Sequence, residues 1–231
     1  MRTRALLLKR VEFGESDLVL TLFTERYGRI SALARGARKS AKRFGGALEP
    51  MHTIELGLEE RAKSELFTLK EAEIAVPRIG LTASLERLEA AGLVLSWVRR
   101  AAPARTPEPE LWELLAALLD RLAARNELDV RRLLAAAGLR LIAALGWGLD
   151  FERCVRCGKD CPGGMPGLID ATHGGLVCRS CGGARRKLDG LLRDRLGRAA
   201  RDGDPAALEP EDAKVALDLV EQVLRAHAGF E

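Results

Sequence analysis

The sequence of 231 residues lacks any run of the roughly 20 apolar residues that a membrane-spanning helix needs. Its first ten residues contain one stretch of three leucines, which ends at Lys9 and Arg10, and this is too short and too charged for a signal peptide. We therefore expect a cytoplasmic protein that has no membrane partner.

Catalytic motifs are absent as well. The sequence contains no phosphate-binding loop, no Gly-x-Ser-x-Gly and no His-Glu-x-x-His. Histidine is rare, and His52 and His227 have no neighbour at a spacing typical of catalysis or metal binding. These absences argue against an ATPase, a hydrolase or a nuclease. We expect a protein that is not an enzyme and has no catalytic residue.

Cysteine is confined to one short segment, and this pattern predicts a metal site. All five cysteines lie between Cys154 and Cys181, and such a cluster in an intracellular chain favours a metal over disulfides. Two Cys-x-x-Cys pairs are separated by twenty residues, and each pair can bind one side of a tetrahedral ion. Four thiolates leave no position for water, so we expect one structural Zn²⁺. The expected ligands are Cys154, Cys157, Cys178 and Cys181.

The fifth cysteine leaves an alternative open. Cys161 lies four residues after Cys157, a spacing that does not pair it naturally with the second Cys-x-x-Cys. Exchange of one ligand for Cys161 or His173 is the alternative to the four-cysteine set.

The first 75 or so residues alternate apolar and polar positions in short runs, which indicates β-strands. Gly14, Gly28 and the pair Gly45–Gly46 supply turns between the runs. Five short strands in this length predict a small barrel, although the pattern alone does not separate a barrel from an SH3-like sheet. The expected strands cover residues 5–13, 17–25, 29–37, 51–59 and 65–73.

After Pro77 the pattern changes to leucine and alanine at spacings of three and four residues, which is typical of amphipathic helices. Thr106 and Pro107 are expected to start the second of these helices. The segment 151–183 is rich in glycine and cysteine and has no helical period. The expected helices cover residues 84–102, 110–125, 129–146 and about 187–227, the last interrupted near 203–205.

A basic loop follows the third expected strand. The net charge is only +4, so the distribution of charge matters more than its sum. Six basic residues and no acid lie between residues 29 and 43, a density that attracts phosphate groups. They are Arg29, Arg35, Arg38, Lys39, Lys42 and Arg43. The alternative is a solvated and mobile charged loop.

Aromatic residues make up only 4% of the chain, which limits the candidates for stacking on bases. Proteins that bind single strands combine a basic groove with aromatic platforms. Tyr27 and Phe44 lie beside Gly28 and the basic loop, and they are the candidates for base stacking. We expect Phe13 and Phe23 in the hydrophobic core.

A second basic stretch runs from Arg185 to Arg201, with seven cations and two acids on an expected helix. This stretch either extends a DNA path, forms a surface for a partner protein, or is a solvated helix face. A solvated face is favoured, because a helix exposes such residues readily.

Taken in order, the motifs resemble the RecO family of recombination mediators. The resemblance covers about residues 7–181, and the helices after Lys187 are less distinctive. It rests on GESD at the start of the second strand, the turn from Thr24 to Gly28, the basic GAR loop, Leu48 with Pro50, and the sequences FERCVRCG and GGLVCRSC.

The resemblance implies an α+β multidomain fold, with a five-stranded OB-type barrel followed by an α-helical domain that contains an inserted four-cysteine zinc finger. The implied parts are the OB domain at 1–78, the helical domain at 79–149 and 185–231, and the zinc finger at 150–184.

The resemblance also implies a function. A RecO protein binds single- and double-stranded DNA, anneals complementary strands and works with RecR and single-strand-binding protein to load RecA. By position, the family's DNA contacts fall on Arg35, Arg38, Lys39, Lys42 and Arg43, with Arg29 a weaker addition, and the metal ligands fall on the four cysteines named above. Three rival hypotheses remain: a zinc-containing protein-interaction scaffold without a direct DNA role, a zinc-ribbon transcription or RNA-binding factor, and a hydrolase or nuclease, which would need metal-dependent cleavage.

Overall fold

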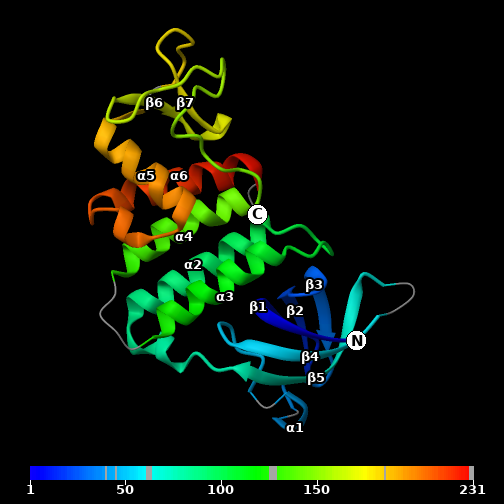
Figure 1. Ribbon diagram of the computed structural model, residues 1–231. Coiled ribbons are helices and arrows are strands. Elements are labelled where there is room, and N and C mark those ends of the chain that lie inside the picture. The colour runs from blue at the N-terminus through cyan, green and yellow to red at the C-terminus, as the bar shows by residue number, and fades with distance from the viewer. Residues whose placement is uncertain (40, 45, 61–63, 125–128, 185, 229–231) are drawn as a thin grey trace. The chain divides into compact units, whose positions relative to one another are not determined.

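The computed structural model describes residues 1–39, 41–44, 46–60, 64–124, 129–184 and 186–228 (Figure 1). The side chains of Ala41 and Lys42 lie outside the described part of the chain. Two compact units divide the chain, Met1–Arg125 and Asn126–Glu231. The expected four-part division into domains stays a prediction.

The first unit begins with a closed barrel, which confirms the predicted OB-type fold over the SH3-like alternative. Neighbouring strands in the barrel have the order β1-β2-β3-β5-β4, and β4 pairs with β1 to close it. All neighbours are antiparallel except β3 and β5. The strands are β1 (Arg2–Phe13), β2 (Asp17–Thr24), β3 (Gly28–Ala34), β4 (Thr53–Glu59) and β5 (Leu66–Val76), with the short helix α1 (Ala41–Phe44) between β3 and β4.

The barrel core consists of the inward positions of the alternating strands. Leu20, Leu22 and Ile54 are fully buried there. At the end of β1 this pattern stops. Residues 9–13 are exposed on both faces, because β1 and β2 continue as a hairpin past the core after an irregularity between Leu7 and Lys9.

Two helices, α2 (Leu85–Ala101) and α3 (Pro109–Ala123), complete the first unit after the 3₁₀ turn η1 (Ile79–Ala83). The rings of Phe23 and Trp112 lie 6.0 Å apart and pack α3 against β2, so the expectation of a buried Phe23 is confirmed. This contact covers the outer face of one end of β2.

The expected helix start at Thr106 and Pro107 is wrong, because α3 begins at Pro109. The chain before it turns at Arg105, which has a φ of 55°, and bonds to the start of β3. The N–H of Arg29 donates to the Pro103 carbonyl at 3.4 Å, and the N–H of Arg105 donates to the Arg29 carbonyl at 2.9 Å. This pairing holds the segment out of a helix.

The described part of the second unit contains three α-helices and a three-stranded sheet in the order β7-β6-β8. The elements are α4 (Val130–Ala144), β6 (Gly167–Asp170), η2 (Ala171–His173), β7 (Gly175–Val177), β8 (Arg186–Leu188), α5 (Gly190–Asp202), η3 (Pro205–Ala207) and α6 (Asp212–His227). The last helical stretch was expected from about Lys187, but β8 occupies that position because it pairs with β6. The side chain of Asp189 then caps α5, and the expected interruption occurs at Gly203, which has a φ of 67°.

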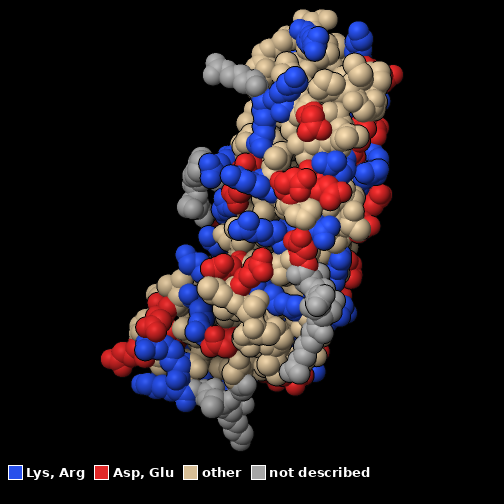
Figure 2. Space-filling view, turned by 90° about the vertical axis from the view of Figure 1, so that its left-hand side faces the viewer, with Lys and Arg blue, Asp and Glu red and all other residues tan. Residues whose placement is uncertain are grey.

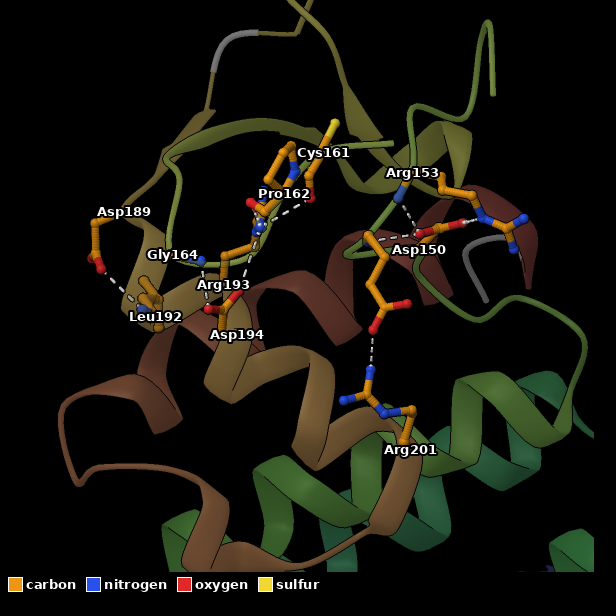
Figure 3. Close-up of polar contacts among 11 residues, drawn as sticks. Asp150, Arg153, Cys161, Pro162, Gly164, Asp189, Leu192, Arg193, Asp194 and Arg201 are labelled. Carbon is orange, nitrogen blue, oxygen red and sulfur yellow. Dashed lines mark hydrogen bonds and ion pairs between the residues drawn. The ribbon is translucent and has the colours of Figure 1, made fainter. Parts of the chain in front are cut away.

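Helix α5 anchors the cysteine-rich segment through Arg193, which is only 1% exposed. Its Nη2 donates to the carbonyl oxygens of Cys161 and Pro162 (Figure 3). The neighbouring Asp194 carboxylate accepts a hydrogen bond of 2.7 Å from the N–H of Gly164. These hydrogen bonds fix the cysteine-rich segment on α5.

The favoured hypothesis, that the basic residues of α5 form a solvated face, is therefore wrong for some of these residues. Arg193 is buried, and Arg195 donates from Nη2 to the Asp212 carboxylate at 2.9 Å. Arg198 and Arg201 are exposed, and Arg201 pairs with Glu152. Arg185 lies outside the described residues. Within the described ranges, no helix has the length and apolar character required to cross a bilayer.

Candidate nucleic-acid interface and metal site

The hairpin turn between β1 and β2 and the basic loop form one structure. The Asp17 carboxylate accepts a hydrogen bond of 2.8 Å from the N–H of Gly36, and the N–H of Arg38 donates to the Ser16 carbonyl at 3.0 Å. Gly36 has a φ of 63°, a conformation that glycine adopts without strain. The GESD and GAR motifs are thus joined in space, and Asp17 holds the start of the basic loop.

The cations of this loop are at the surface. Arg35, Arg38, Lys39 and Arg43 are exposed. Arg38 pairs with Glu12 at 3.2 Å, and the Arg43 guanidinium donates to the Arg35 carbonyl. Figure 2 shows one group of lysine and arginine side chains at the lower left, with acidic side chains beside it; Figure 1 places α1 at the bottom of the same vertical axis. The side chain of Lys42 lies outside the described residues.

Arg29 differs from these cations in the contacts that it makes. Its side chain is half-buried, and Nε donates to the carbonyl of Ala102 at 2.8 Å. Together with its backbone bonds, this contact ties the connection between α2 and α3 to the barrel. Arg29 therefore has a structural role that the count of basic residues did not reveal.

The structure reverses the expectations for two aromatic residues. Phe44 is 3% exposed and belongs to the barrel core, so its candidacy for base stacking is wrong. Phe13 was expected in the core but is 59% exposed on the hairpin. The sequence does contain a signal for this exposure: Phe13 directly precedes the turn residue Gly14, and the end of a strand beside a turn can extend past the core.

Tyr27 keeps part of its ring accessible and packs against Phe67, with the ring centres 6.5 Å apart. It lies in the turn from Thr24 to Gly28, where the Thr24 hydroxyl accepts from the N–H of Tyr27 at 3.0 Å and donates to the Gly28 carbonyl at 2.9 Å. A Cβ on Gly28 would lie 1.9 Å from the Thr106 carbonyl oxygen, so only glycine fits there. Stacking by Tyr27 stays a prediction.

Replacing Asp17 with alanine is expected to free the basic loop. The change removes the charged acceptor of the Gly36 N–H, and a hydrogen bond to a charged group contributes about 1.5–3 kcal/mol. We expect faster hydrogen exchange at Gly36 and a lower free energy of unfolding by about 1–2 kcal/mol. Asp17→Asn retains an acceptor oxygen and is the matched control. Equal exchange rates in the two variants would show that this bond does not hold the loop.

The four predicted cysteines meet in the second unit. The sulfur atoms of Cys154, Cys157, Cys178 and Cys181 all lie within 4.8 Å of one another. Each Cys-x-x-Cys closes in a tight turn, in which Gly158 donates to the Cys154 carbonyl at 2.8 Å and Gly182 donates to the Cys178 carbonyl at 3.1 Å. Both glycines have positive φ, a conformation that glycine adopts without strain. These four cysteines form a metal-binding site.

Backbone donors favour the thiolate form that binds metals. The N–H of Cys178 donates to the Cys154 sulfur at 3.3 Å, which lowers the pKa of Cys154 to about 6. The N–H of Cys181 similarly lowers the pKa of Cys178. Hydrogen bonds to Cys157 and Cys178 raise the pKa of Cys181 to about 12.

The alternative ligands lie outside this cluster. The Cys161 sulfur contacts the Lys159 carbonyl at 3.8 Å, and burial raises the pKa of its thiol. The His173 ring pairs with Asp170 at 2.9 Å. The Arg156 guanidinium bridges the two cysteine turns by donating to the Gly182 carbonyl at 2.9 Å. The fold thus brings together the four-cysteine set without Cys161 or His173.

Comparison with known proteins agrees with these features. The family model for the N-terminal part of recombination protein O matches residues 1–78, and the model for its C-terminal part matches residues 83–230. The chain belongs to the RecO family. The first match contains the barrel, and the second contains the cysteine cluster and the helices, so the resemblance found from the motifs is confirmed.

Curated RecO relatives match this chain over nearly its whole length. DNA repair protein RecO of Geobacter metallireducens is 32% identical over 98% of this chain and 91% of its own. The protein of the same name in Anaeromyxobacter dehalogenans is 36% identical over 96% of this chain and 89% of its own. That of Myxococcus xanthus is 34% identical over 97% of this chain and 91% of its own.

Proposed function

We propose that this RecO-family protein acts in DNA repair and homologous recombination as a mediator. It binds single- and double-stranded DNA, anneals complementary strands and, with RecR, helps to load RecA onto DNA coated by single-strand-binding protein. The observation that supports a direct DNA role is the basic loop, whose exposed cations are held against the β1–β2 turn by Asp17. The proposed DNA contacts are Arg35, Arg38, Lys39, Lys42 and Arg43.

Annealing requires no bond-making chemistry by the protein. A cationic surface that binds one strand lowers the phosphate repulsion against a second, and bases that point away from the protein remain free to pair. The ion pair of Arg38 with Glu12 is exposed, and such pairs contribute about 0–1 kcal/mol, so phosphate can displace the carboxylate. We infer that the protein is not an enzyme.

We further propose that the four cysteines hold one structural Zn²⁺. Their all-sulfur donor set fits a closed tetrahedral zinc site, which leaves no position for a reacting water. The bound ion supplies folding free energy, on the order of 10 kcal/mol in comparable sites. The chain's own contribution is to place the thiolates with two glycine turns and to join these turns through Arg156.

Annealing of two complementary oligonucleotides tests the proposal. We expect the protein to accelerate duplex formation in the absence of nucleotide cofactors, and to do so less at high salt. Unrelated single-stranded DNA is expected to compete at least as well as RNA. A protein that neither binds DNA at low salt nor anneals strands would contradict the proposal and favour the scaffold hypothesis, whereas preferential competition by RNA would favour an RNA-binding factor.

A further inference from the structure

The hairpin formed by β1 and β2 presents exposed apolar side chains past the barrel core. Phe13 is 59% exposed and Val11 is 47% exposed. Two residues apart on one strand, they point to the same face. A phenylalanine exposed to this extent contributes only part of its possible burial energy to the fold, so packing alone is a weak reason for this residue at this position.

The apolar character continues across the sheet. Val11 lies opposite Val19 on β2, and Val19 lies opposite Leu33 on β3. Residues directly opposite each other share a face, and Val19 and Leu33 are both half-buried. Phe13, Val11, Val19 and Leu33 therefore form an apolar strip on the outer face of three strands. At the other end of β2, α3 covers the same face of the strand through the contact between Phe23 and Trp112.

Cations border this strip. Lys9 is exposed and shares the face of Val11 and Phe13. Opposite Phe13 lies Asp17, which accepts the Gly36 N–H and so brings the start of the basic loop beside the strip. The exposed Arg35 directly precedes Gly36.

The acids near Phe13 are few. Glu15 is exposed in the turn, and the Asp17 carboxylate is already bonded to Gly36 and Ser16. Glu12 alternates to the opposite face and pairs with Arg38. An apolar strip with a cationic border fits a ligand that has flat apolar faces and a negatively charged backbone, as a single strand of nucleic acid has.

We propose that Phe13 stacks on an unpaired base of bound DNA and that the apolar strip distinguishes single strands from duplexes. This inference rests on the proposed DNA-binding function. A single strand offers free base faces to the ring, whereas in a duplex these faces are stacked on one another. The basic loop attracts both forms, and Phe13 adds affinity only for the single strand.

The test compares Phe13→Ala and Phe13→Tyr with the unchanged protein, using an oligo-dT strand and a duplex of equal length. Loss of stacking on one base is expected to weaken single-strand binding by about 5- to 150-fold for Phe13→Ala. Duplex binding is expected to change by less than about twofold, and Phe13→Tyr is expected to keep most of the affinity, because its ring still stacks. Ile79→Ala removes another exposed apolar side chain of the same unit, 71% exposed, and is the control.

A spectroscopic readout separates stacking from a general loss of contact. Phe13→Trp places an indole on the hairpin, and oligo-dT is expected to quench its fluorescence beyond any change in the unchanged protein. No added quenching, unchanged single-strand affinity in Phe13→Ala, or equal losses for strand and duplex would each overturn the inference; the first two would favour a protein partner for the strip. Absence of DNA binding by the unchanged protein would instead overturn the proposed function, and this inference with it.

Discussion

Replacing Arg35, Arg38 and Lys39 with glutamate lowers the affinity for single-stranded DNA by about a hundredfold or more near physiological salt, if the basic loop is the DNA surface. Each cation that contacts a phosphate releases counterions on binding, and a glutamate in its place repels the phosphate. The three side chains are exposed, and only Arg38 has an ion pair among the described residues, a pair that contributes little to stability. The barrel is therefore expected to stay folded.

The matched control changes the net charge equally at another place. Arg121, Arg131 and Lys214 are exposed on helices, and their replacement by glutamate alters the charge by the same amount. We expect this control to weaken binding by less than about fivefold, because exposed charges outside the proposed DNA contacts are screened. Equal effects of the two triple variants would mean that total charge alone governs binding. Full activity of the loop variant would instead direct attention to Arg198 and Arg201 on α5.

Removal of the metal is expected to have the second largest effect and to unfold the cysteine-rich segment. Residues 151–184 contain few buried apolar side chains, so burial alone does not order them. In the metal-free protein or in Cys157→Ser, we expect rapid proteolysis within this segment and loss of the bonds from Arg193 to Cys161 and Pro162. The barrel has its own closed core and is expected to keep its circular dichroism signal.

Cys161→Ser is the control for this experiment, because Cys161 lies outside the cluster. It is expected to bind one equivalent of zinc and to resist protease like the unchanged protein. An unchanged protease pattern after chelation would show that the segment folds without metal. Loss of zinc in Cys161→Ser would show that the ligand set is wrong.

Local patterns in the sequence predicted most of the fold. Strand alternation, helical spacing and the two Cys-x-x-Cys pairs each depend on residues close together in the chain, so they are visible without a structure. Within the site, the same kind of information located the basic loop and the metal ligands. The short strand β8 was missed because three residues have no period of their own and pair only through β6.

The exposure of single side chains was harder to predict, because it depends on contacts between distant segments. Phe44 follows a run of cations, yet the chain folds back and places it in the barrel core. Phe13 has the pattern of a strand residue, but the hairpin extends past that core. Arg193 is buried by a loop 31–32 residues before it in the chain, through the carbonyl groups of Cys161 and Pro162.

The dependence of single-strand affinity on salt tests the central claim most directly, that exposed cations of the barrel loop bind DNA phosphates. For single strands, the slope of log K against log salt is about −0.7 per phosphate contact. We predict a steep slope for the unchanged protein and a slope smaller by about 2 in magnitude for the variant with Arg35, Arg38 and Lys39 replaced by glutamate. Between 50 and 200 mM salt, a protein with about 6–10 phosphate contacts loses about a thousandfold or more in DNA affinity. Two results would contradict this account: an affinity that hardly changes over this range of salt, or equal slopes for the two proteins.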